Sequence, residues 1–137
     1  MSCVEHDGLP DPACTPGATD PRVTQATIDS TICVSGYTKR VRPPTRVTEP
    51  IKREEIRAYA LTGPLSAYEL DHLIPLELGG APASVANLWP EPWNGPQNAH
   101  DKDHVENELH RRVCAHEMNL DDAQRRIASN WQTALTG

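Results

Sequence analysis

A chain of 137 residues with 37% hydrophobic and 23% charged residues is typical of one globular domain, not of a low-complexity or fibrous protein. With no Phe, three Trp, three Tyr and thirteen Pro, the core must be small and much of the backbone irregular. The net charge of −6 excludes a uniformly basic surface, so any contact with phosphates must use a local patch.

Residues 1–22 contain four prolines and two glycines and predict an extended, irregular arm. The four cysteines, Cys3, Cys14, Cys33 and Cys114, are dispersed and form no C-x-x-C pair, which argues against a zinc knuckle. Such spacing favours one or two disulfides and a secreted or extracytoplasmic location, with four free thiols as the alternative. We expect at least one disulfide, with Cys14 and Cys33 as the favoured pair. No apolar run is long enough to cross a membrane, so no membrane partner is expected.

The apolar spacing of residues 23–33 predicts a short helix. Residues 37–48 hold two adjacent prolines and several β-branched residues, and they predict extended chain or an edge strand. A helix is expected over 49–61, with Thr48 as its N-cap, Pro50 in its first turn and Gly63 beyond its end.

Basic residues concentrate just before and within this helix. Seven of the thirteen lie between Lys39 and Arg57, opposed there only by Glu49, Glu54 and Glu55. The patch predicts a surface for nucleic acid, with Arg46 and Arg53 as candidate substrate-binding residues. A solvated helix face paired with those acids is the alternative.

The second half of the chain predicts a strand, turn and strand over 68–78, a long helix over 98–114, and a last helix from Asn119 to about Leu135. In the long helix, Val105, Leu109 and Val113 form an apolar stripe for the core. No repeat or second domain is evident, so 1–137 is expected to be one domain and a monomer.

The segment D-H-L-I-P-L-E-L-G-G, which begins at Asp71, is followed by Asn87-Leu88 and then by the 98–114 helix. In type and order these residues resemble the metal-binding core of the HNH endonucleases, and more loosely small secreted actinobacterial proteins of that type. The resemblance implies an α+β fold in which a ββα-metal core over 68–106 is joined by flanking helices and the Pro-rich arm. It also implies a divalent metal, Mg²⁺ or Mn²⁺ before Zn²⁺ or Ni²⁺.

Phosphodiester hydrolysis needs a base that deprotonates water and positive charge near the phosphate. His72 is the candidate general base, because an imidazole accepts a proton near neutral pH. Asp71 is a hard carboxylate suited to a divalent metal. By the resemblance, Asn87 orients the base or braces the long loop. Each of these residues also has a purely structural alternative. His72 could be a packed histidine, Asp71 a turn residue, and Asn87 the asparagine of an Asx-turn.

The third metal position in the family lies in the first turn of the helix, and three residues compete for it here: Asn98, His100 and His104. Asn98 and His100 are the favoured ligands. Lys102 is a candidate for phosphate contact, although an i, i+4 pair with Glu106 explains it as well. Glu69 shares a strand face with Asp71 and is expected to be an outer or solvent-facing acid.

Together these features predict a metal-dependent endonuclease that acts on DNA, with RNA as a further substrate. The alternative is a non-catalytic secreted binding module that keeps the same scaffold.

Overall fold

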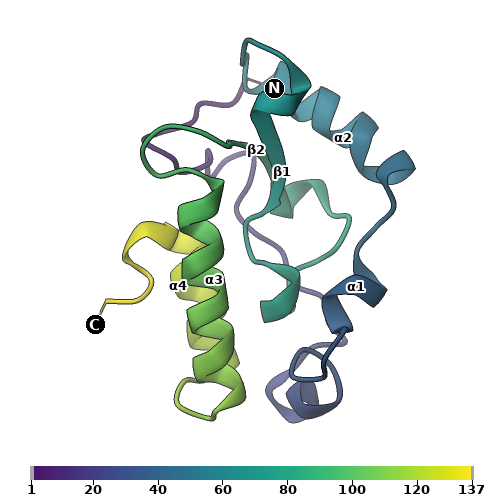
Figure 1. Ribbon diagram of the computed structural model, residues 1–137, viewed down its shortest axis with the longest axis vertical. Coiled ribbons are helices and arrows are strands. Elements are labelled where there is room, and N and C mark those ends of the chain that lie inside the picture. The colour runs from purple at the N-terminus through teal and green to yellow at the C-terminus, as the bar shows by residue number, and fades with distance from the viewer. Residues whose placement is uncertain (1, 137) are drawn as a thin grey trace.

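The computed structural model describes residues 2–136 and contains helices and strands, in keeping with the expected α+β class (Figure 1). The helices are α1 (Tyr37–Val41), α2 (Thr45–Ala58), α3 (Ala99–Cys114) and α4 (Leu120–Asn130). Strands β1 (Tyr68–His72) and β2 (Leu88–Pro92) pair antiparallel, with Glu69 opposite Glu91 and Asp71 opposite Trp89. Short 3-10 turns occur at Gln25–Ser30, Leu65–Ala67, Leu76–Leu78, Val85–Asn87 and Trp131–Thr133.

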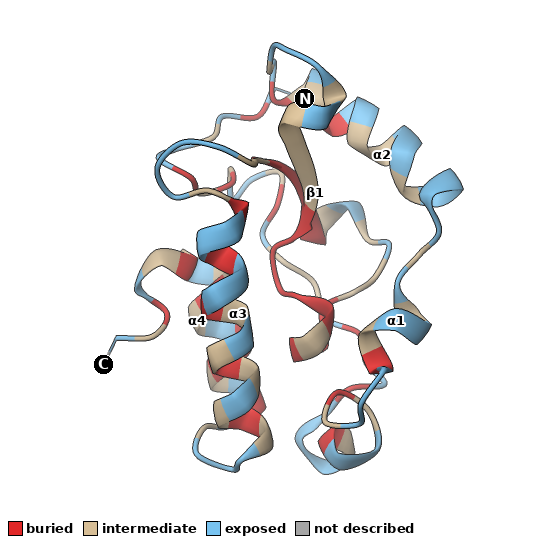
Figure 2. Ribbon diagram, viewed as in Figure 1, coloured by how far each residue is buried: buried red, intermediate tan, exposed pale blue. Residues whose placement is uncertain are grey.

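The hairpin lies at the centre of the molecule, between α2 on one side and α3 with α4 on the other (Figure 1). The expected stripe of Val105, Leu109 and Val113 is buried against Leu120 and Ile127 of α4. A second, smaller apolar cluster holds Tyr59, Leu73 and Trp89 beside the disulfide of the N-terminal arm. The chain after β1 is buried, whereas the outer face of α2 is exposed (Figure 2).

Three sequence-based expectations about local structure were wrong. Residues 37–48 are not extended, because Pro43 and Pro44 separate α1 from α2 and do not interrupt a strand. Pro44 is the N-cap of α2, so this helix begins at Thr45, before Thr48, and Pro50 lies inside it. The strand that pairs with β1 lies beyond the glycines, at 88–92, because the chain after His72 forms a buried loop with a 3-10 turn at 76–78.

Both pairs of cysteines form disulfides, Cys3–Cys14 and Cys33–Cys114. The expected disulfide bonding is therefore confirmed, but the favoured pair Cys14–Cys33 was wrong. Cys33–Cys114 joins the loop after the first 3-10 turn to the end of α3 and spans 81 residues. Cys3–Cys14 closes a short loop within the arm.

The N-terminal arm is irregular, as expected, but it is held by backbone hydrogen bonds. Gly17 N–H donates to Ala86, Asp20 N–H to Gly79, and Ala81 N–H to Ala18. The arm therefore packs along the loop that connects the two strands. Among residues 2–136, no helix is long and apolar enough to span a membrane.

Candidate functional site

The end of β1 presents its last two side chains in different surroundings. His72 is 8% exposed, and its Nε2 lies 2.8 Å from the carbonyl oxygen of Pro82. Because a carbonyl oxygen only accepts, Nε2 carries the hydrogen, and the neutral ring keeps its lone pair on Nδ1. Burial lowers the pKa of His72, against the opposing effect of this hydrogen bond, and so favours the neutral ring that a general base requires.

A cleft of about 390 Å³ lies in front of His72. Its walls come from the α1–α2 connection, α2, β1 and Trp93, and they include the basic side chains of Arg42 and Lys52. Neither cation forms an ion pair with any residue in the 2–136 range. Both are therefore available to an anion that enters the cleft. Two acids also line it: Glu49, which is paired with Arg53, and Glu69.

Asp71 points toward α3. It is 4% exposed, and its Oδ2 accepts from Trp89 Nε1 at 3.0 Å and lies 2.9 Å from Lys102 Nζ. The backbone register explains the Trp89 contact, because Asp71 and Trp89 are opposite one another in the hairpin.

Lys102 is fully buried at the second turn of α3. Its ammonium also lies 2.6 Å from Glu106 Oε2 and donates to the backbone carbonyl of His72 at 3.0 Å. Burial alone would lower the pKa of Lys102, but Asp71, Glu106 and Glu91 outweigh it and raise that pKa. The ammonium is thus charged and inaccessible, so in this structure it cannot contact a phosphate bound at the surface.

Three carboxylates gather beside this lysine. Oxygens of Glu69, Asp71 and Glu91 all lie within 4.8 Å of one another. Glu91 is 0% exposed, and neither of its oxygens has a hydrogen-bond partner; the same holds for Oε2 of Glu69. Burial, followed by the neighbouring acids, raises the pKa of Glu91 to about 10 and that of Glu69 to about 7.

These acids fit a hard divalent cation, whose preferred ligands are carboxylate oxygens. With Glu106 included, four carboxyl groups surround the ammonium of Lys102. If all four were ionised, the cluster with Lys102 would carry a charge of about −3, so Lys102 alone does not neutralise the acids. A dication would restore the ionised form of Glu91 and satisfy its two oxygens.

Asn87 braces the loop and does not contact the histidine ring. Its side chain is 0% exposed. Its Oδ1 accepts a hydrogen bond from Ile74 N–H at 2.9 Å. Its Nδ2 donates to the backbone carbonyls of Ile74 at 3.0 Å and Ala81 at 3.1 Å. A Cβ on Gly80 would lie 1.7 Å from the Ile74 oxygen, so only glycine permits this close packing. The loop fixed in this way carries Pro82, which holds His72.

Of the candidate third ligands, neither His100 nor His104 belongs to the acid cluster. Asn98 is the N-cap of α3: its Oδ1 accepts from Asp101 N–H, and its Nδ2 donates to Gly95. His100 is exposed and packs against Trp93 with 5.2 Å between ring centroids, and His104 is exposed. The amide of Asn98 is thus engaged in capping.

The two arginines chosen from the sequence lie on the exposed surface of α2. Arg53 is paired with Glu49 at 2.8 Å, and neither Arg46 nor Arg53 lines the cleft. Arg42 and Lys52 belong to the basic patch expected from the sequence, although Arg46 and Arg53 were the residues chosen from it, whereas Glu91 was missed. Glu91 could have been found by pairing the two strands in register, because this places it opposite Glu69. The positions of Arg42 and Lys52 depend on the bend between α1 and α2, which no short-range pattern indicates.

Neither the known protein-family models, nor the curated proteins, nor the solved structures give a significant match to this chain. The functional argument therefore depends on the geometry of the cleft and the acid cluster.

Proposed function

We propose that this protein is a metal-dependent phosphodiester hydrolase that acts on nucleic acid, with DNA as the first substrate to test and RNA as the second. The observation that carries the proposal is the state of His72: its Nε2–H is fixed by Pro82, and its ring borders a cleft that holds two unpaired cations. A neutral imidazole aimed by a backbone carbonyl is suited to take a proton from water.

In the proposed reaction, Nδ1 of His72 accepts a proton from a water molecule, and the water oxygen attacks phosphorus. The bond between phosphorus and the leaving ester oxygen breaks, and that oxygen takes a proton from solvent water. Arg42 and Lys52 bind the phosphate oxygens and orient the backbone of the substrate in the cleft. Glu69, Asp71 and Glu91 would hold a divalent cation, Mg²⁺ or Mn²⁺. Of these three acids only Glu69 lines the cleft, so the bound ion would supply positive charge to the phosphate from the side of Glu69.

Glu69 connects the two parts of the site, because it lines the cleft and also belongs to the acid cluster. Its unpartnered Oε2 is buried at this junction. The order strand, strand and helix over 68–114, with Asp71 and His72 at the end of the first strand, agrees with the arrangement that the HNH resemblance implies. This agreement supports the proposal independently of the charges.

A second candidate is a metal-free nucleic-acid-binding module. The observation that favours it is Lys102, whose ammonium already lies 2.9 Å from Asp71 and could serve as an internal replacement for a metal. On that reading the cleft binds phosphates through Arg42 and Lys52 without hydrolysis.

Cleavage assays with purified protein separate the two candidates. Supercoiled plasmid DNA and a single-stranded RNA are incubated with Mn²⁺ or Mg²⁺, with a chelator in parallel. The hydrolase predicts metal-dependent nicking that the chelator abolishes. Retention of DNA in a mobility-shift assay without any nicking, in either metal, would support the binding module.

A further inference from the structure

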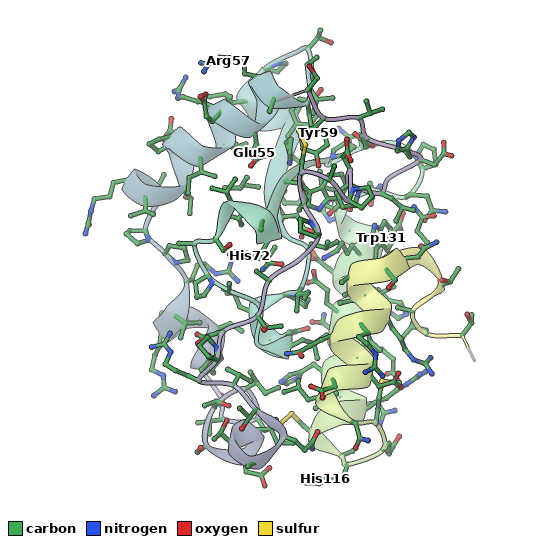
Figure 3. The ribbon with its side chains drawn as sticks, turned by 180° about the vertical axis from the view of Figure 1, so that it is seen from behind. Glu55, Arg57, Tyr59, His72, His116 and Trp131 are labelled. Atoms are coloured by element: carbon green, nitrogen blue, oxygen red, sulfur yellow. A yellow bond between two sulfur atoms is a disulfide. The ribbon has the colours of Figure 1, made fainter. Side chains whose placement is uncertain are left out.

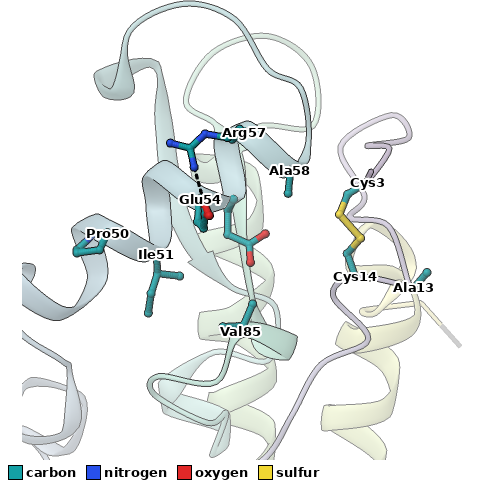
Figure 4. Close-up of a pocket in the computed structure, with 10 residues that line it drawn as sticks. Cys3, Ala13, Cys14, Pro50, Ile51, Glu54, Arg57, Ala58 and Val85 are labelled. Carbon is teal, nitrogen blue, oxygen red and sulfur yellow. Dashed lines mark hydrogen bonds and ion pairs between the residues drawn. A yellow bond between two sulfur atoms is a disulfide. The ribbon is translucent and has the colours of Figure 1, made fainter. Parts of the chain in front are cut away.

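A second hollow lies away from the cleft of His72. It has a volume of about 760 Å³ and is formed by α2, the Cys3–Cys14 disulfide and the loop residue Val85 (Figure 4). None of its lining residues lines the His72 cleft. Its volume falls in the range of about 300–1,000 Å³ that is usual for small-molecule sites.

The lining of this pocket is mainly apolar, with Pro50, Ile51 and Ala58 on α2, Val85 opposite them, and the disulfide at one end. Val85 is 55% exposed, although it is a large aliphatic residue. An aliphatic ligand chain in the pocket would cover surface that is now in contact with water, a gain of about 0.8 kcal/mol per buried methylene.

One charged group in the pocket has no counterpart. Glu54 is paired with Arg57, so each already has a partner. Glu55 is 6% exposed, and its side chain forms no hydrogen bond or ion pair within residues 2–136. Figure 3 shows Glu55 on α2 near Tyr59 and separate from His72. Burial, followed by the charge of Glu54, raises the pKa of Glu55 to about 7. A buried acid whose side chain has no donor is costly to the fold and requires an explanation.

We propose that this pocket binds a small aliphatic ammonium compound, with the ammonium on the Glu55 carboxylate and the chain along Ile51, Ala58 and Val85. An ammonium supplies three donors and the missing positive charge, whereas the pocket's other ionic groups, Glu54 and Arg57, already satisfy each other. A carboxylate or phosphate ligand would be repelled by Glu55. The net charge of −6 favours a cation further.

The probe for the test is n-hexylammonium, and its binding to the full chain is measured by calorimetry and by backbone amide shifts. Saturable binding is expected, with shifts confined to α2, the Cys3–Cys14 loop and the turn at Val85. Affinity should fall about threefold to fourfold for each methylene removed from the chain. Hexanoate should not bind, and 1-hexanol should bind more weakly than the ammonium.

Glu55→Gln keeps the shape of the side chain and removes its charge, so it should weaken hexylammonium binding roughly tenfold to a hundredfold. Glu54→Gln is the matched control, because it removes one charge from the same helix and pocket but should change affinity less than about threefold. Val85→Trp, at an exposed position, should block the pocket while Glu55 is intact. Absence of saturable binding, or equal affinity for Glu55→Gln and the natural protein, would overturn the proposal.

The binding should also depend on pH. Glu55 must ionise to hold the ammonium, and the neighbouring groups that face it are Glu54, Arg57 and Tyr59. Hexylammonium, like a lysine side chain with a pKa of about 10.4, remains charged up to pH 8. Affinity is therefore expected to rise between pH 6 and pH 8, and a flat profile would contradict the role of Glu55.

Discussion

The two faces of the hairpin at the end of β1 differ in how their charges are satisfied. Toward α3, the buried Asp71 and Glu91 and the partly buried Glu106 lie around Lys102, with more carboxylates than the ammonium can neutralise. Toward α2, His72 borders an open cleft with two cations that form no ion pair within residues 2–136. The first face is suited to hold a cation inside the protein, and the second is suited to receive an anion from solution. A metal-dependent hydrolase needs both, and adjacent residues of one short strand provide them.

The largest expected effect comes from removal of the internal ammonium. Lys102→Met should destabilise the protein by about 3–5 kcal/mol, because Asp71 and Glu106 lose the cation that compensates their burial. Urea unfolding at pH 7 measures the loss. Lys52→Met, in the open cleft, is the matched control and should change stability by less than about 0.5 kcal/mol. Similar losses for both variants would show that the two faces do not differ as described.

A smaller change in stability, in the opposite direction, is expected when Glu91 is replaced. Burial, followed by the neighbouring acids, raises the pKa of Glu91, so at pH 8 this carboxyl group must take up a proton on folding. Glu91→Gln removes that cost, and it should stabilise the metal-free protein by about 2–3 kcal/mol at pH 8 and abolish any rise in Tm on addition of Mn²⁺. Thermal unfolding with a chelator and with Mn²⁺ tests both parts. Glu108→Gln, an acid already paired with Arg111 and Arg112, should leave the effect of Mn²⁺ unchanged. A persistent Mn²⁺ response in Glu91→Gln would exclude Glu91 as a ligand.

The same cluster predicts the pH dependence of stability. Folding raises the pKa of Glu91 from 4.5 to about 10, so the folded chain binds more protons than the unfolded chain between these values. The contribution of Glu91 to the free energy of unfolding is therefore fully present below pH 4.5, and it is lost as the pH rises toward 10. The free energy of unfolding in chelator should therefore fall between pH 5 and pH 8, by about 1 kcal/mol per pH unit or less. Mn²⁺ should flatten this slope, and a slope that is flat without metal would contradict the account.

At the cleft of His72, on the side of the hairpin toward α2, the expected effect is on the binding of DNA. Charge reversal at both Arg42 and Lys52 should weaken DNA binding at low salt and reduce the slope of log K against log[salt] by about 2. The corresponding reversal at Arg46 and Arg53 should change the slope less, because these residues lie outside the cleft and Arg53 is paired with Glu49. If the Arg46 and Arg53 variant loses more affinity, the nucleic acid lies along the outer surface of α2.

The sequence was sufficient to predict the elements that depend on local patterns. The α3 helix begins after Asn98 as expected, because the N-cap and the apolar stripe are short-range signals. The expected disulfide bonding was also confirmed. The pairing partners were not predictable, because loop length leaves several connections open and only packing brings Cys114 next to Cys33.

The site was predicted less completely, for a related reason. Asp71, His72 and Asn87 lie on the elements expected of them, but their partners, Lys102, Pro82 and Ile74, are 10 to 31 residues away in the chain or bind through backbone atoms. A side chain's type does not show whether it will be a cap, as for Asn98, or remain without a partner, as for Glu91. Those outcomes depend on tertiary contacts.

The measurement that tests the central claim most directly is the rate of plasmid nicking in Mn²⁺ by the natural protein, by His72→Ala and by His104→Ala. Loss of the general base should lower the rate by about 10²–10⁴-fold in His72→Ala. His104→Ala, at an exposed position on α3, should nick at the natural rate. Equal rates for the natural protein and His72→Ala, or no nicking by the natural protein in Mn²⁺ or Mg²⁺, would contradict the assignment of His72 as the base of a hydrolase.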